Sequence, residues 1–319
     1  MKQIVVFSII ILTFLSCKSD NAIEAEILKI ESNFVVERFD KVFASAKPES
    51  LTQLKKTFPF LFSKRIPDSL WIERMTDSFQ VALNDAIIKE LGDFNTPTQD
   101  IKRLFQHLRY YDQTFTEPRV ITLTNFVDYR NKIVVTDSLV LIAIDNYLGS
   151  EHEFYSGIAR YITKNMKPSQ IVVDLAKAYG EKQIFQSEKK TLLDDMIYFG
   201  KQLYFKDKVI PFKTDAEKIG YIQDELEFAQ VNEEMIWTQF VQNEMLYSTD
   251  SSLPARFIAD APFSKFYLEL DNQTPGRLGQ YIGWQIVRAY MKNNDVSLQN
   301  MMQKDAIEIF NKSNYKPPK

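Results

Sequence analysis

The stretch Thr274-Pro-Gly-Arg-Leu-Gly-Gln-Tyr-Ile-Gly-Trp-Gln-Ile-Val-Arg-Ala-Tyr-Met-Lys292 decides the fold. It predicts a helix that begins with a capping threonine and has proline in its first helical position, where the missing N–H costs nothing. Gly276, Gly279 and Gly283 are three of the nine glycines in the whole chain. Each interior glycine costs a helix about 1 kcal/mol relative to alanine. At about 100° per residue they share one face, which suits close approach by another backbone.

The opposite face of this helix carries arginine and tryptophan, which are favoured anchors in protein interfaces. We interpret it as a candidate partner-binding surface. The residues assigned to that surface are Arg277, Trp284 and Arg288 of this helix, with Trp237 and Glu244 of the preceding helical segment. The alternative is a helix packed on the core that keeps only a solvated polar edge. Asn232, Glu233 and Glu244 could also pair with Arg277 or Arg288 as buried ion pairs.

The N-terminus predicts export and a lipid anchor. Residues 1–16 have a short basic start and then an almost wholly apolar run, too short to span a bilayer. Phe14-Leu15-Ser16-Cys17 resembles a bacterial lipobox, and Cys17 is the only cysteine. We predict a signal peptide over residues 1–16, a lipidated tether over residues 17–27 and a single domain over residues 28–319. An ordinary signal peptide with a chance cysteine is the alternative.

The composition narrows the possible functions. The chain has 39 basic and 42 acidic residues, a formal net charge of −3, and no basic stripe stands out. We therefore expect no nucleic-acid partner. The 24 phenylalanines and 15 tyrosines indicate a large packed core rather than a disordered segment.

Hydrophobic periodicity predicts helices around a small sheet. Runs rich in β-branched residues predict strands at 34–39, 119–124, 132–136 and 139–144, the last two as a hairpin. Residues 40–115 have a helical pattern that prolines divide into short helices, and single helices are predicted over residues 168–180, 191–204, 215–247 and 297–310. The helix after Thr191 has Asp194 placed for a capping box. The order predicts an α+β fold that is predominantly α-helical.

Motifs for catalysis are mostly missing. The chain has two histidines, His107 and His152, and Ser156 stands where a His-Glu-x-x-His motif beginning at His152 needs its second histidine. No Gly-x-Ser-x-Gly, Gly-x-Gly-x-x-Gly or Walker A motif occurs. We predict no catalytic residue, no metal ligand and no cofactor. Hydrolysis by paired carboxylates on the helical segment after Asp215 stays an alternative to a solvated acidic face.

Several segments together resemble the GldB family of gliding-motility lipoproteins. They are Met196-Ile-Tyr-Phe-Gly-Lys-Gln-Leu-Tyr204, Asn232-Glu-Glu-Met-Ile-Trp237, Leu246-Tyr-Ser-Thr-Asp250, Ala261-Pro-Phe-Ser-Lys265 and the stretch from Pro275 to Arg288, with Arg38-Phe39-Asp40 and Asp145-Asn-Tyr-Leu-Gly149. The resemblance covers nearly the whole mature chain, in order, after a lipobox. It implies a lipoprotein of gliding bacteria that is needed for movement and associated with type IX secretion.

The resemblance also implies a distant relation to zinc-peptidase (zincin-like) folds. Active relatives have a His-Glu-x-x-His helix, followed by a helix with a glutamate ligand just before a glycine. The corresponding positions here are Val173-Asp-Leu-Ala-Lys177 and Phe199-Gly200, which lack both histidines and the glutamate. The resemblance therefore implies a degenerate metal site on a fold kept for binding.

From the residues and the resemblance together, we expect a non-catalytic lipoprotein of the cell envelope. It would act as a scaffold or assembly factor of the gliding and type IX secretion machinery. Its expected partners are a membrane, through the lipid on Cys17, and other proteins of that machinery. The alternatives are an envelope metallopeptidase-like or peptidoglycan hydrolase, and a periplasmic chaperone or ligand carrier.

Overall fold

The computed structural model describes residues 20–188, 190–269 and 271–318. The strands are β1 (Val36–Arg38), β2 (Arg119–Leu123), β3 (Ile133–Val135) and β4 (Leu139–Ala143). The helices of the N-terminal half are α1 (Asp20–Ile27), α2 (Phe39–Ala44), α3 (Leu51–Thr57), α4 (Asp68–Thr76), α5 (Ser78–Leu91) and α6 (Asn95–Tyr111). Those of the C-terminal half are α7 (Arg160–Thr163), α8 (Ile171–Glu181), α9 (Leu192–Val209), α10 (Asp215–Ile219), α11 (Gln223–Val231), α12 (Glu233–Gln242), α13 (Leu253–Phe257), α14 (Leu278–Asn293), α15 (Leu298–Gln303) and α16 (Ala306–Ser313).

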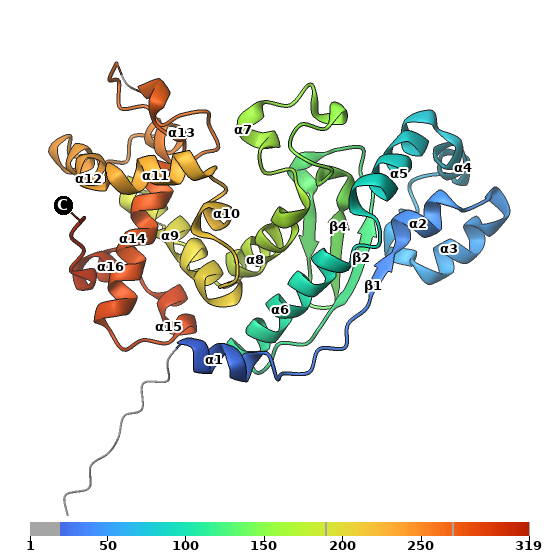
Figure 1. The fold of residues 1–319 in the computed structure, drawn as a ribbon, viewed down its shortest axis with the longest axis horizontal. Coiled ribbons are helices and arrows are strands. Elements are labelled where there is room, and N and C mark those ends of the chain that lie inside the picture. Colours follow the sequence, from blue (N-terminus) through green and yellow to red (C-terminus); the bar gives the residue numbers. More distant parts are fainter. Residues whose placement is uncertain (1–19, 189, 270, 319) are drawn as a thin grey trace, which may run out of the picture.

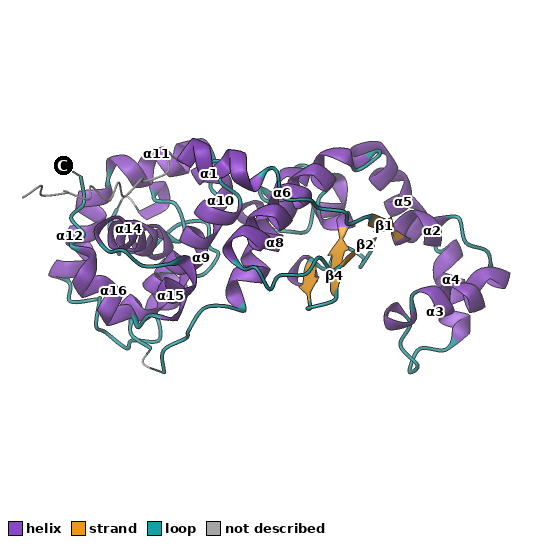
Figure 2. Cartoon of the chain, turned by 90° about the horizontal axis from the view of Figure 1, so that it is seen from below, coloured by secondary structure: helices purple, strands orange, loops and turns teal. Residues whose placement is uncertain are grey.

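The small sheet lies between two helical parts (Figures 1 and 2). Its strand order is β1-β2-β4-β3, with β1, β2 and β4 parallel and β3 antiparallel to β4. All four strands were predicted from the sequence, and the β3–β4 hairpin is confirmed. The α+β fold dominated by helices is confirmed as well.

The sheet is covered on both faces because its side chains alternate. Val120 of β2, with Val140 and Ile142 of β4, belongs to the larger core, which continues through the C-terminal helices. Ile121 of β2 points into a smaller core filled by aromatic side chains such as Phe39. Helices α2, α3 and α4 supply most of that smaller core. Successive residues of a strand thus serve opposite layers.

The C-terminal half is organised around the crossing of α9 and α14, which lie side by side in Figure 1. A Cβ atom on Gly283 would overlap the carbonyl oxygen of Met196, and one on Gly200 would overlap the carbonyl oxygen of Gly283. The two backbones are therefore in direct contact. The close approach predicted for the glycine face is confirmed, and Gly200 is the partner residue on α9.

The start of the glycine helix differs from the prediction. Helix α14 begins at Leu278, after Arg277 in a left-handed conformation with φ of 61°. The backbone N–H of Leu278 donates to Ser264 Oγ, while the Thr274 hydroxyl donates to the carbonyl oxygens of Ser264 and Asp271. Thr274 therefore stabilises the preceding loop, and a serine from a distant segment caps the helix.

Two other helices that were predicted as continuous are divided in the structure. The segment 215–247 forms α10, α11 and α12, because Gly220 ends α10 in a left-handed conformation with φ of 72° and Asn232 separates α11 from α12. The segment 297–310 is likewise divided into α15 and α16, with Asp305 capping the second. The Thr191–Asp194 capping box of α9 is confirmed.

The predicted tether overlaps an ordered helix. Residues 20–27 form α1, and the side chain of Ile27 is buried. Glu24 accepts hydrogen bonds from Arg103 and from the ring of His107 on α6. The predicted signal peptide and Cys17 lie outside the described residues. No helix among the described residues is both long and apolar enough to cross a bilayer.

Gly283→Ala tests the contact between α9 and α14. The added methyl group meets backbone rather than a movable side chain, so we expect the free energy of unfolding to fall by about 3 kcal/mol. Gly157→Ala is the control, because a Cβ there meets nothing within 4 Å. Urea denaturation of both variants measures the difference. Equal stability of the two would show that the helices are not held at backbone contact.

Candidate functional site

The polar face of α14 is fixed by an ionic network around Asp207 of α9. Trp284 Nε1 donates to Asp207 Oδ2 at 2.9 Å. Arg288 donates to both oxygens of the same carboxylate, at 2.8 and 2.9 Å. Lys218 of α10 adds a third donor, with Nζ 2.9 Å from Oδ1. One carboxylate therefore ties three helices together.

Asp215 completes this network. It accepts hydrogen bonds from Arg288 at 2.9 and 3.0 Å, and the guanidinium lies 3.7 Å from the centroid of the Trp284 ring. Burial disfavours the charged form of Asp215, but the hydrogen bonds from Arg288 and Lys218 outweigh it and lower its pKa. Burial likewise opposes the charge on Arg288, yet its two carboxylate partners raise its pKa. The network holds helices together, and we refer to its residues, Asp207, Asp215, Lys218, Trp284 and Arg288, as the clamp.

The predicted partner-binding surface does not form as one patch. Trp284 is 0% exposed, so its assignment to an accessible surface is wrong. Arg288 faces the two aspartates, and Arg277 donates to the carbonyl oxygen of Gly220 at 2.7 Å. Trp237 packs against the rings of Phe310 and Tyr315.

Glu244 is exposed beyond the end of α12, in a left-handed conformation with φ of 54°. The ion pairs considered between the α12 segment and the two arginines do not form either. Glu233 instead accepts hydrogen bonds from the hydroxyls of Tyr281 and Tyr315, at 2.7 and 2.8 Å. The alternative of a helix packed on the core agrees with the glycine face, but it placed Trp284 on a solvated edge, so neither interpretation predicted that Trp284 is buried.

The two histidines lie in separate places. His107 is fully buried in α6 and contacts Glu24 and the carbonyl oxygen of Arg103, at 2.8 and 2.7 Å. His152 accepts a hydrogen bond from the backbone of Phe154. Within residues 20–188, 190–269 and 271–318, no group of three or more His, Cys, Asp or Glu side chains is arranged to hold a metal ion.

A cavity of about 560 Å³ opens beside the N-terminal end of α14. Helices α8, α9, α10 and α13 supply the other walls. Its charged lining residues are Lys177, Lys206, Lys218, Asp260 and Arg277. Its apolar lining residues include Phe199, Leu203, Ile219, Pro254 and Ile258. A volume between about 300 and 1,000 Å³ is typical of small-molecule sites.

Lys206 is the unusual residue of this cavity. It is 7% exposed, and its ammonium donates to the carbonyl oxygen of Lys218 at 2.7 Å. Burial, with the positive charges of Lys177 and Arg277 nearby, lowers the pKa of Lys206 to about 7. An ammonium has three donors, and a carbonyl has no charge to balance it. A protonated Lys206 therefore has unused donors in a nearly dry environment.

Gln202 lies one helical turn before Lys206 and lines the same cavity. It is 3% exposed, and its amide nitrogen, although near Tyr198, has no well-formed hydrogen bond. Residues four apart on a helix are neighbours on its surface. The cavity lining thus combines a buried ammonium with a buried amide whose nitrogen interacts with Tyr198.

The cavity also contains positions that the family resemblance singled out. Lys177 of α8 and Phe199 of α9 both line it. They occupy the places where the resemblance puts a histidine and a glutamate ligand of active relatives. Neither side chain is a metal ligand of the usual kind, so the residues present do not fit a zinc ion.

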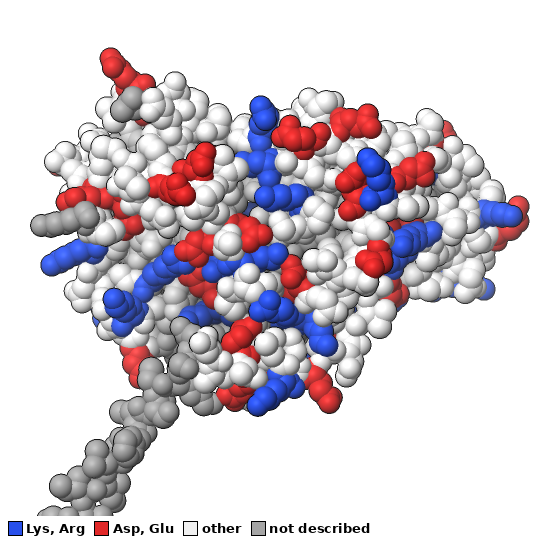
Figure 3. All heavy atoms as spheres, in the orientation of Figure 1, with Lys and Arg blue, Asp and Glu red and all other residues white. Residues whose placement is uncertain are grey.

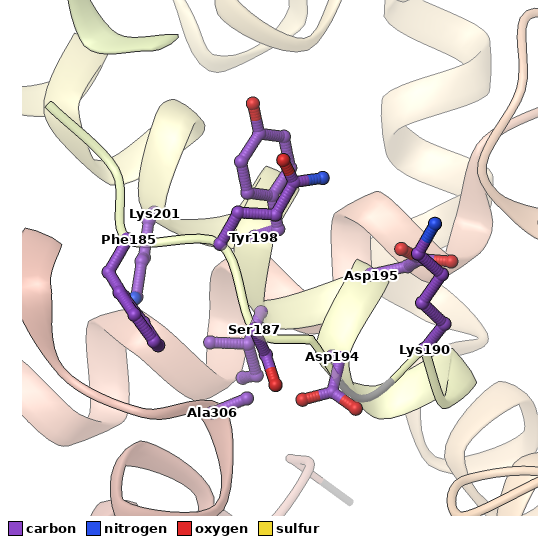
Figure 4. A pocket seen from close by; sticks show the side chains of 10 residues that line it. Phe185, Ser187, Lys190, Asp194, Asp195, Tyr198, Lys201 and Ala306 are labelled. Carbon is purple, nitrogen blue, oxygen red and sulfur yellow. The ribbon is translucent and has the colours of Figure 1, made fainter. Parts of the chain in front are cut away.

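A smaller pocket of about 140 Å³ lies on another side of α9 (Figure 4). Lys201 stands beside Phe185 there, with Asp194, Asp195 and Lys190 on the opposite side of the view. The Lys201 ammonium donates to the carbonyl oxygens of Met302 and Lys304, at the end of α15. Burial lowers the pKa of Lys201 to about 8. Here a buried lysine satisfies the end of a helix.

Charge elsewhere on the molecule is mixed. Basic and acidic side chains are interspersed over the face shown in Figure 3, and neither sign dominates it. The cavity site escaped the sequence analysis because Met196-Ile-Tyr-Phe-Gly-Lys-Gln-Leu-Tyr204 was considered for its family resemblance and not as a site. The available signal was Gln202 and Lys206, two long polar side chains in a helix whose residues are mostly buried.

Comparison with known protein families matches residues 20–317 to the family described as gliding motility protein GldB. The chain belongs to the GldB family. Membership indicates a role in gliding motility and association with the cell envelope. The match covers all the elements from α1 to α16, including those that line the cavity and form the ionic network. No curated protein and no solved structure gives a significant match.

Arg288→Ala tests the clamp around Asp207. It leaves two partly buried carboxylates with Lys218 as the remaining charged partner, so we expect a loss of about 2–4 kcal/mol in the free energy of unfolding at pH 7. Lys292→Ala, at an exposed position one turn later, should change it by less than about 0.5 kcal/mol. Chemical denaturation measures both.

The difference in stability between the wild type and Arg288→Ala should depend on pH. Because the pKa of Asp215 is lowered in the folded state, its contribution is present above its unfolded pKa of about 4 and is lost as pH falls through the folded value. The stability difference between the wild type and Arg288→Ala should therefore narrow below about pH 4. A difference that stays constant down to pH 2 would contradict this account.

Proposed function

We propose that this chain is a lipid-anchored, non-catalytic scaffold or assembly factor of the gliding and type IX secretion machinery, and that it binds its partner at the cavity beside α14. Family membership supports the gliding role. The lipobox-like Phe14-Leu15-Ser16-Cys17 supports the anchor. The observation that carries the binding role is the cavity itself, with Lys206 held in it at the expense of stability.

The chemistry of the cavity favours binding over hydrolysis. A general base or a metal-bound water needs carboxylate or imidazole groups directed at the substrate. The cavity instead presents ammonium, guanidinium and amide donors beside an apolar wall, with Asp260 as its acidic lining residue. That donor set recognises an anion or a polar segment and holds it. The hydrolase alternative gains no support from this lining.

A ligand carrier of the envelope is the second candidate. The enclosed mixture of apolar and cationic walls would also suit a small amphipathic molecule carried between partners. The two roles differ in what leaves the site. A scaffold keeps its partner bound, whereas a carrier exchanges its ligand. Co-purification of a small molecule with the chain, identified by mass spectrometry, would favour the carrier.

Cys17→Ser tests the anchor. Without the thiol no thioether-linked lipid forms, so we expect the chain to leave the membrane fraction and to lose labelling by a radioactive fatty acid. Gliding should be lost or strongly reduced in a strain whose only copy carries the change. Ser19→Ala, two residues later, is the control. Membrane retention of the Cys17→Ser protein would contradict the lipid anchor.

Lys206→Met tests the cavity as the functional site. We expect the variant to fold, with equal or greater stability at pH 7, because it removes a buried ammonium without a charged partner. Gliding should nevertheless be lost, since the cavity loses its main donor. Lys201→Met is matched to it, being a buried lysine on the same helix that bonds to carbonyl oxygens outside the cavity. Normal gliding of Lys206→Met with a normal protein level would contradict the proposed site.

A further inference from the structure

We infer that the cavity beside α14 binds a single carboxylate group borne on an apolar body, with Lys206 Nζ as the donor to its oxygens. The inference deepens the proposed function by assigning the class of ligand to that same site. Two observations carry it, namely the unbalanced charge of the cavity and the unused donors of the Lys206 ammonium.

The charge balance of the cavity lining favours a ligand with a single negative charge. Lys218 is already paired with Asp207 and Asp215. Arg277 lies 3.4 Å from Asp260, and Lys177 lies 3.8 Å from Glu181. Lys206 is the cation of the lining with no acidic partner within ion-pair distance. One negative charge would balance it, which fits a carboxylate better than a phosphate dianion.

The unused donors of Lys206 select a group with acceptor oxygens. Its ammonium has three donors, and the hydrogen bond that the structure shows for it goes to the carbonyl oxygen of Lys218. A ligand in the cavity can accept from the remaining donors. A carboxylate supplies two acceptor oxygens and makes charge-assisted hydrogen bonds with the ammonium.

The apolar wall selects the rest of the ligand. Phe199 and Leu203 stand on the same face of α9 as Lys206, and Pro254 and Ile258 approach from the α13 side. The apolar surface thus begins beside Lys206. Peptide C-termini with an apolar last residue and short fatty acids share this chemistry. The experiment below distinguishes these two sources.

Binding should be coupled to protonation of Lys206. The charged groups near it are Lys177, Asp174 and Glu181 on α8, Lys218 on α10, Arg277 before α14 and Asp260 after α13. In the free protein Lys206 is about half protonated near neutral pH. A bound carboxylate stabilises the ammonium, so affinity should fall by about tenfold or more between pH 6.5 and 8.5. Binding at pH 8.5 should take up close to one proton.

The test is isothermal titration calorimetry on the full chain in a non-ionic detergent. The probes are acetyl-Ala-Ala-Leu with a free carboxylate, the same peptide as its C-terminal amide, octanoate and inorganic phosphate. We expect a carboxylate probe to bind at least tenfold more tightly than the amide and than phosphate. A preference for the peptide or for octanoate identifies the source. Repeating the titration at pH 8.5 in two buffers of different ionisation enthalpy measures proton uptake.

The variants test whether binding depends on the Lys206 side chain itself rather than on the stability of the fold. Lys206→Met should abolish binding of the carboxylate probe. Lys201→Met should bind like the wild type. Equal affinity for the acid and the amide, phosphate binding as tight as the carboxylate, or unchanged binding by Lys206→Met would each overturn the inference.

The gliding assay keeps the two proposals distinct. If no carboxylate binds but Lys206→Met still abolishes gliding, the cavity is functional and the ligand class is wrong. If the carboxylate binds through Lys206 and the variant glides normally, the ligand assignment stands and the cavity is not the site of the gliding function.

Discussion

The backbone contact between Gly200 of α9 and Gly283 of α14 is the constraint on which the C-terminal half depends. Glycines inside helices cost stability, so their presence at both sides of one crossing indicates that helix separation matters more than helix propensity. Close approach lets α14 insert Trp284 and Arg288 beside Asp207, and the aspartate then bonds to both. The polar clamp forms where the glycines bring the helices together.

Features set by local sequence were predictable. The glycine face of the 274–292 stretch indicated a close backbone contact before its partner was known. The four strands, the β3–β4 hairpin and the Thr191–Asp194 cap likewise depend on nearby residues. The order of the predicted elements indicated the predominantly helical α+β class. Each of these predictions rests on a period or a cap, which one sequence displays directly.

Features set by tertiary contacts were not predictable. Ser264 caps α14 from a separate loop, so Thr274 looked like the better candidate. Trp284 has the spacing of a solvated edge, but Asp207 gives its indole N–H a buried partner. Lys206 resembles any lysine on the polar side of a helix until α10, α13 and the start of α14 enclose it. In each case the role of the residue depends on the groups that it contacts in the folded chain. Periodicity in one sequence does not identify those groups.

Helix α9 carries the glycine contact, the cavity residues and the central aspartate of the clamp on one rigid element. Gly200 faces α14, Gln202 and Lys206 line the cavity, and Asp207 anchors the clamp, all within about two turns. Lys218 belongs to both the clamp and the cavity, since its ammonium donates to Asp207 and its carbonyl oxygen accepts a hydrogen bond from Lys206. The clamp therefore fixes the acceptor that holds the unbalanced ammonium. A methionine would fill the same space without burying a charge, so the presence of a lysine at position 206 argues for a ligand.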